Sequence, residues 1–146
     1  MVSLAATMGD GPFSRTGGWK EASNDFCAAI SVAANYELTT LSWGNIWTPA
    51  TGEPIESRKG ASPVNHVTQK IKPLLIIHSD NDQSVPIENA LGMVDALKKA
   101  GATYTFHRYP TAGHMGITDE VIDRSLEFIG QQSTGNNRKP AKGAGR

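Results

Sequence analysis

The chain has 146 residues, of which 38% are hydrophobic and 19% are charged, so it has the length and composition of one globular domain. Its 14 basic and 14 acidic residues cancel, which gives no electrostatic reason to expect nucleic acid or an anionic membrane as a partner. No apolar run approaches the roughly 20 residues of a membrane-spanning helix. Cys27 is the only cysteine, which excludes a disulfide within the chain, and its apolar neighbours predict a buried side chain.

The pattern of apolar residues predicts helices and strands in alternation. In chain order it predicts a helix at 2–8, a strand at 26–34, a long connection at 35–66, a strand at 72–78, a helix at 89–100, a strand at 103–109 and a helix at 119–128. The run at 26–34 also fits a buried helix, because periodicity alone does not separate the two. A connection as long as 35–66 is usually functional or contains small elements of its own.

This alternation predicts an α/β fold with a mostly parallel sheet flanked by helices. The folded domain is expected to cover residues 1–132. Residues 133–146 have no apolar side chain larger than alanine and no acid, so they predict a disordered basic tail. Because four of the 14 basic residues lie in that tail, the domain keeps 10 basic against 14 acidic residues and is mildly acidic.

Two residues that suit acid–base catalysis follow neighbouring predicted strands. Asp82 lies in the polar loop after the strand at 72–78, and His114 lies in the loop after the strand at 103–109. Parallel strands end at one edge of a sheet, so the carboxylate and the imidazole are expected to meet there. A carboxylate that orients a histidine, which in turn deprotonates a nucleophile, is the arrangement of a Ser-Asp-His triad.

The segment that runs from Ser62-Pro63 through His78-Ser79-x-x-Asp82-x-x-Val85-Pro86 to Gly113-His114 resembles the C-terminal part of the α/β-hydrolase family. The resemblance is to its esterase and prolyl-oligopeptidase-like branch, in which the triad follows the order Ser, Asp, His. It implies that Asp82 is the triad acid and His114 the triad base. It also implies hydrolysis of an ester through an acyl-serine intermediate, without a cofactor.

The most important departure of the chain from this family is that it contains no G-x-S-x-G motif, and it also lacks the Gly-rich segment that helps to form the oxyanion hole. Residues 2–8 resemble the helix that follows this motif, and Ser3 has none of its glycines. The chain is therefore expected to be part of a hydrolase domain that lacks the nucleophile. It is expected to be inactive alone and to associate with a missing N-terminal half or with itself, because a divided sheet exposes an edge and apolar faces.

Other candidate residues have competing interpretations. Tyr36, Trp43 and Trp47 follow a predicted strand end, and two interpretations remain open: they line a substrate pocket or they pack the connection against the sheet. Asp80 is the nearest rival of Asp82. The run Asp80-Asn81-Asp82 resembles the start of a calcium loop but lacks its later glycine and glutamate. The remaining histidines, His66, His78 and His107, are expected to be structural or exposed, and no metal site is expected.

The sequence leaves more than one function open. A serine peptidase of the prolyl-oligopeptidase type has the same acid and base as an esterase, so the residues do not separate the two. A non-catalytic binding module is consistent with the missing nucleophile but has no need of an acid–base pair. A flavodoxin-like regulator is disfavoured because the chain has neither an acidic cluster nor a phosphate-binding loop.

Overall fold

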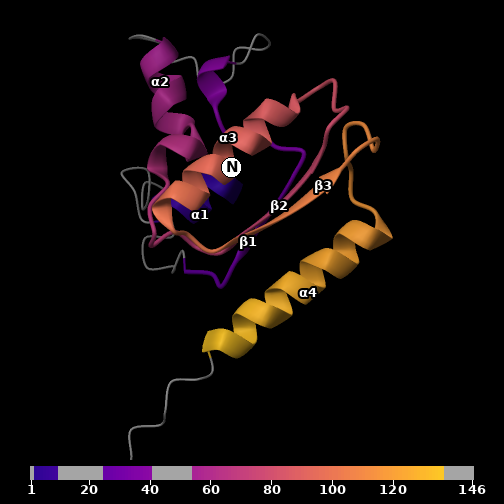
Figure 1. Cartoon of the computed structure of the whole chain (residues 1–146). Coiled ribbons are helices and arrows are strands. Elements are labelled where there is room, and N and C mark those ends of the chain that lie inside the picture. Colours follow the sequence, from indigo (N-terminus) through magenta and orange to yellow (C-terminus); the bar gives the residue numbers. More distant parts are fainter. Residues whose placement is uncertain (1, 10–24, 41–53, 137–146) are drawn as a thin grey trace, which may run out of the picture.

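The computed structural model describes residues 2–9, 25–40 and 54–136 (Figure 1). Its elements are α1 (Val2–Met8), β1 (Ala29–Val32), the 3₁₀ turn η1 (Leu38–Thr40), α2 (Pro54–Ala61), the 3₁₀ turn η2 (Pro63–His66), β2 (Leu74–Ser79), α3 (Ile87–Ala100), β3 (Tyr104–Tyr109) and α4 (Asp119–Asn136). The predicted alternation of helices and strands is confirmed. The connection at 35–66 contains small elements, as its length indicated.

The described strands form one parallel sheet in the order β1-β2-β3. All six residues of β2 are buried, because this strand has a partner on each side and helices over both faces. Its Leu- and Ile-rich sequence is typical of such a central parallel strand. The α/β fold with helices around a parallel sheet is therefore confirmed.

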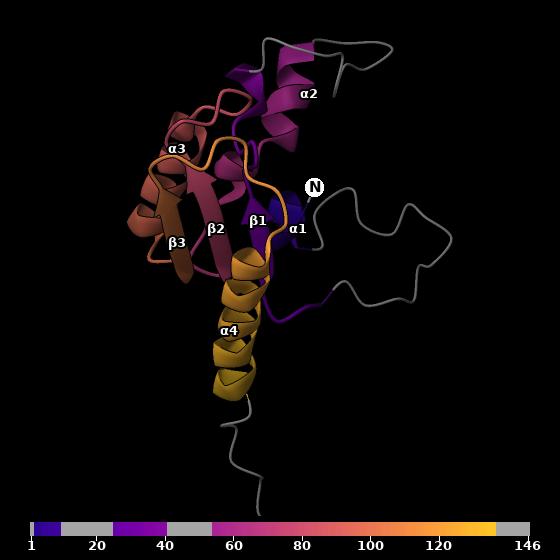
Figure 2. The same ribbon diagram turned by 90° about the vertical axis from the view of Figure 1, so that its right-hand side faces the viewer.

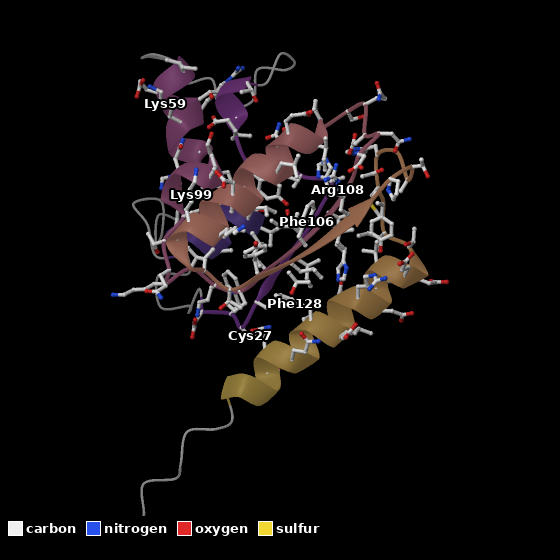
Figure 3. The ribbon with its side chains drawn as sticks, in the orientation of Figure 1. Cys27, Lys59, Lys99, Phe106, Arg108 and Phe128 are labelled. Carbon is white, nitrogen blue, oxygen red and sulfur yellow. The ribbon has the colours of Figure 1, made fainter. Side chains whose placement is uncertain are left out.

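The helices cover the two faces of the sheet unequally. In Figures 1 and 2, α1 and α3 lie on one face and α4 lies on the other. On the first face, Met93 and Leu97 of α3 pack on Leu74 and Ile76. On the second face, Val121 and Phe128 of α4 pack on Leu75 and Ile77, and Figure 3 shows Phe128 directed from α4 toward the sheet. Alternate residues of β2 thus serve two separate cores.

The end of α3 agrees with its sequence signal. Gly101 has a φ of 66°, and the backbone N–H groups that follow Ala100 return to the carbonyl groups of Leu97 and Lys98. A left-handed residue at this position suits glycine, which has no Cβ to clash. The strand β3 begins shortly afterwards, so the cap sets the direction in which the chain returns to the sheet.

Two expectations about the ends of elements differ from the structure. Cys27 is exposed, because β1 begins at Ala29 and leaves Cys27 in the segment ahead of the sheet, so the prediction of a buried thiol is wrong. The last helix was predicted at 119–128 from its apolar face, but it reaches Asn136. It therefore includes the first residues of the expected tail. Residues 137–146 lie outside the described part. No helix within the described ranges is long and apolar enough to cross a membrane.

Candidate active site

The loop after β2 holds Asp82 in a fixed position. Although it is charged, Asp82 is only 4% exposed. Its Oδ1 atom accepts hydrogen bonds from the backbone N–H of Ser84 at 2.8 Å and of Val85 at 2.9 Å. An aspartate that bonds the backbone two and three residues ahead stabilises a tight turn, so the loop itself determines where the carboxylate points.

The loop after β3 brings His114 to the same carboxylate. The Nδ1 atom of His114 lies 2.9 Å from Oδ2 of Asp82 and 3.1 Å from Oδ1. Because a carboxylate only accepts hydrogen bonds, Nδ1 carries the proton in this contact, and Nε2 of the neutral ring keeps its lone pair. The His114 side chain is 52% exposed, and Nε2 has no hydrogen-bond partner in the described part of the chain. The pair therefore presents an oriented base.

The environment of Asp82 favours its ionised form. Burial raises the pKa of the Asp82 carboxyl, but hydrogen bonds from Val85, His114 and Ser84 together outweigh this effect. The pKa consequently lies below its ordinary value. An ionised partner is what a histidine base needs, since the negative charge stabilises the imidazolium that forms when the base takes a proton.

A second set of hydrogen bonds joins the two loops. The hydroxyl of Ser79, at the buried end of β2, donates to Oδ1 of Asn81 at 2.8 Å and accepts the N–H of Ala112 at 2.9 Å. Oδ1 of Asn81 also accepts the N–H of Gly113 at 2.7 Å. These contacts, hereafter the loop brace, fix the residue immediately before His114. Gly113 has a φ of 65°, a conformation that favours glycine.

His78 and Asp80 have supporting positions beside this pair. His78 is fully buried, and its Nε2 atom donates to the carbonyl oxygen of Val85 at 2.8 Å. This bond holds the far end of the loop after β2, which contains Asp82. The same Nε2 atom lies 3.7 Å from Oδ2 of Asp82. Asp80 pairs with Arg108 of β3 instead of His114. Asp82, and not Asp80, thus contacts His114, while His78 contacts the loop that holds Asp82.

A hollow of about 610 Å³ adjoins His114. It is lined by His114 and by residues that follow β1 and β2, namely Ala33, Asn35, Gln83, Ser84 and Val85. Ala33, the first residue after β1, has a φ of 45°, which turns the chain sharply at this edge. The hollow gives a small molecule access to the oriented base.

Tyr36, the one aromatic candidate within the described ranges, does not line this hollow. Tyr36 has no exposed surface, and its hydroxyl donates to Oγ of Ser31 at 2.8 Å, so its side chain packs in the core. Burial raises the pKa of this phenol well above its ordinary value. Trp43 and Trp47 lie outside the described residues. Besides His114, the hollow is lined by polar residues, Asn35, Gln83 and Ser84, and by Ala33 and Val85, none of which the sequence analysis singled out as lining a site.

The other two histidines make contacts away from this site. A ring nitrogen of His66 contacts the carbonyl oxygen of Gly60 at 2.7 Å, at the junction of α2 and η2. His107 is half-buried on the face of β3 toward α4, and burial lowers its pKa. Within the described ranges, no group of three or more His, Cys, Asp or Glu side chains is placed to hold a metal ion.

Comparison with known proteins relates this geometry to a family. The family model of the prolyl oligopeptidase family matches residues 19–134. A probable carboxylic ester hydrolase of Mycobacterium tuberculosis, LipM, is 29% identical over 98 residues, which are 60% of this chain and 23% of LipM. The uncharacterized peptidase YuxL of Bacillus subtilis is 37% identical over 62 residues, which are 42% of this chain and 9% of YuxL.

Solved structures agree with the sequence comparison. A truncated carbohydrate esterase from gut microbiota matches with a TM-score of 0.66 and 25% identity, over 81% of this chain and 46% of that one. A thermophilic esterase of Thermogutta terrifontis matches with a TM-score of 0.63 and 22% identity, over 96% of this chain and 53% of that one. The chain spans about half of these structures and less than a quarter of the two sequence relatives. It has an α/β-hydrolase type of fold and belongs to the prolyl oligopeptidase family.

Proposed function

We propose that Asp82 and His114 are the acid and the base of a serine hydrolase that cleaves ester bonds through an acyl-serine intermediate. The observation that carries the proposal is the hydrogen bond between Nδ1 of His114 and the buried Asp82 carboxylate. It leaves Nε2 of His114, which has no partner among the described residues, beside a hollow. A base in this tautomer accepts a proton from a serine hydroxyl.

In this mechanism the proton moves twice through His114. Nε2 takes the proton of the serine hydroxyl while the serine oxygen attacks the ester carbonyl, and Asp82 stabilises the resulting imidazolium. The imidazolium then gives the proton to the leaving alcohol, and an acyl-serine remains. Nε2 then takes a proton from water while the water oxygen attacks the acyl carbonyl, and the imidazolium returns this proton to the serine oxygen as the bond to the acid breaks.

The proposal includes a nucleophile from outside these 146 residues, since the chain contains no G-x-S-x-G motif. Two structural observations support the docking of a further segment, an upstream half of the domain. Among the described strands, β1 pairs only with β2, so its other edge is open to another strand. Ile122 and Leu126 of α4 are 44% and 63% exposed, although both are large and apolar.

The test compares the chain with a protein extended at its amino end by the residues encoded upstream in the same frame. The extended protein is expected to contain the missing motif and to hydrolyse p-nitrophenyl acetate. Asp82→Asn is expected to lower its kcat roughly 10⁴-fold, because the amide no longer selects the reactive tautomer of His114. The 146-residue chain is expected to show no labelling by a fluorophosphonate.

Two results would contradict the proposal. One is a serine in the 146-residue chain that reacts with the fluorophosphonate, and the other is an extended protein whose hydrolysis is unchanged in both Asp82→Asn and His114→Ala. An extended protein that contains the motif but hydrolyses no ester would favour a binding module.

A serine peptidase is the second candidate. Its specific support is the family match and the similarity to YuxL, which is described as a peptidase. The same acid and base serve both reactions, so the leaving group separates them. Hydrolysis of a dipeptide p-nitroanilide with a higher kcat/KM than that of the p-nitrophenyl ester would favour the peptidase.

A further inference from the structure

A second hollow lies along α3, next to the hollow beside His114. The second hollow, hereafter the α3 cavity, has a volume of about 650 Å³. It shares Asn35, Gln83 and Ser84 with the hollow that His114 lines. The α3 cavity therefore lies next to the hollow that His114 lines, and it extends toward the first turns of α3.

The lining of the α3 cavity combines polar side chains that carry no positive charge with a larger area of apolar surface. Seven of the eleven lining residues carry an amide, a hydroxyl or a carboxylate: Asn35, Glu37, Thr40, Gln83, Ser84, Glu88 and Asn89. No lysine or arginine belongs to this lining. Val64 and Pro86 add apolar surface. The two carboxylates disfavour an anionic ligand, and the number of amides and hydroxyls disfavours a purely apolar one.

Two of these polar groups are held in place before any ligand arrives. Oδ1 of Asn89 accepts the backbone N–H groups of Tyr36 and Glu37, each at 3.1 Å. This fixes the identity of the amide atoms and leaves the Nδ2 donor of Asn89 for a ligand. Oε1 of Glu37 accepts the N–H of Thr39 at 3.0 Å and the hydroxyl of Ser62 at 3.2 Å. The Oε2 acceptor of Glu37 has no partner within the described ranges.

The direction of proton transfer indicates which part of an ester lies here. In the proposed function, the protonated His114 gives its proton to the leaving alcohol, so the alcohol must lie next to Nε2. His114 does not line the α3 cavity, but the cavity shares Asn35, Gln83 and Ser84 with the hollow that His114 lines. An alcohol that receives its proton from Nε2 can therefore extend past these three residues into the α3 cavity.

We infer that the α3 cavity binds a polyhydroxylated, sugar-like alcohol, and this inference rests on the proposed function. Each hydroxyl of such a ring both donates and accepts, which matches a fixed donor on Asn89 beside a fixed acceptor on Glu37. The C–H face of the ring matches the apolar surface of Val64 and Pro86. An alcohol whose single hydroxyl group forms the ester has no further hydroxyl groups, so it would bury these polar groups without partners.

The test measures binding of methyl α-D-glucopyranoside to the 146-residue chain by saturation-transfer NMR, which also works on oligomers. Cyclohexylmethanol and a blocked dipeptide are the comparison ligands. The double variant Gln83→Ala/Glu88→Ala removes two exposed polar groups of the α3 cavity. The double variant Glu127→Ala/Gln131→Ala is the matched control, because it removes the same side-chain types from the exposed surface of α4.

The glucoside is expected to bind with a Kd of roughly 1–10 mM and the comparison ligands at least about tenfold more weakly. The cavity variant is expected to bind roughly 5- to 10-fold more weakly than the wild type, and the control variant within about twofold of it. Equal binding of the three ligands, or equal binding of the two variants, would overturn the inference.

The outcome is separable from that of the proposed function. If the glucoside does not bind but ester hydrolysis by the extended protein still depends on Asp82, only the inference of a polyol site is contradicted. A glucoside that binds, with hydrolysis independent of Asp82 and His114, removes the catalytic proposal alone. Preferential binding of the dipeptide would replace the polyol with a peptide.

Discussion

Replacing Ser79 by alanine tests whether the loop brace positions His114. The Ser79 side chain is fully buried and takes part in two hydrogen bonds. Its hydroxyl donates to Asn81 in the loop after β2 and accepts the N–H of Ala112 in the loop after β3. The substitution removes a single oxygen atom, so it leaves almost no cavity and changes mainly these two bonds.

The expected loss follows from the two hydrogen bonds. Each contributes about 0.5–1.5 kcal/mol net, so Ser79→Ala is expected to lower the free energy of unfolding by about 1–3 kcal/mol. The upper part of this range applies if the N–H of Ala112 remains buried without a new acceptor. One of the lost hydrogen bonds joins the loop after β2 to the loop after β3, so the hydrogen bond between His114 and Asp82 should weaken as well.

Urea unfolding of the wild type and the variant gives the change in free energy, and the downfield proton resonance of Nδ1 in His114 reports the bond to Asp82. Ser125→Ala is the matched control, because the Ser125 hydroxyl bonds only the Val121 carbonyl one turn back in α4. This control is expected to change stability by less than about 0.5 kcal/mol, since such a bond contributes little to a helix. If the two variants behave alike, or if Ser79→Ala leaves the Nδ1 resonance unchanged, the brace does not position the histidine.

Three further predictions concern the acid, the core and the cysteine. The pKa of the Asp82 carboxyl is lower in the folded chain than in the unfolded one, where it is about 3.9. The ionised carboxylate therefore stabilises the fold fully above the unfolded pKa, and this stabilisation is lost as the pH falls through the folded pKa. The free energies of unfolding of the wild type and of Asp82→Asn should consequently converge in acid. Leu97→Ala should cost about 2–5 kcal/mol in urea unfolding, because Leu97 is fully buried, whereas Leu91→Ala, at a 37% exposed position of the same helix, should cost less than about 1 kcal/mol. Cys27 should react with Ellman's reagent in the folded chain nearly as fast as in urea, and slow reaction would contradict its exposure.

The elements that the sequence predicts well are those in which one physical signal dominates. The run Leu74-Leu75-Ile76-Ile77 is apolar because both faces of its strand are covered, and α3 ends just before Gly101 because a left-handed residue is needed there. Asp82 and His114 meet because each lies in the loop at the same end of two neighbouring parallel strands. Once these strands are predicted, the positions of the two residues in the following loops predict the contact.

The elements that escaped prediction depend on contacts between distant segments. Ser79 and Asn81 are ordinary polar loop residues in sequence, and their partners Ala112 and Gly113 lie beyond a whole helix and strand. Their only local signal is that short polar side chains near a strand end often bond backbone N–H groups. Apolar composition likewise did not show where β1 begins, which is why Cys27 was expected inside.

The loop brace and the pair it aligns are encoded without interruption by β2, α3, β3 and the loop that follows. A break, an insertion or an exchange of sequence anywhere before Leu74 leaves every one of these contacts within one continuous segment. In the proposed function, one continuous segment from Leu74 onward therefore supplies both the acid and the base. Chimeras joined ahead of Leu74 to nucleophile-bearing segments of relatives are expected to keep the hydrogen bond between Asp82 and His114.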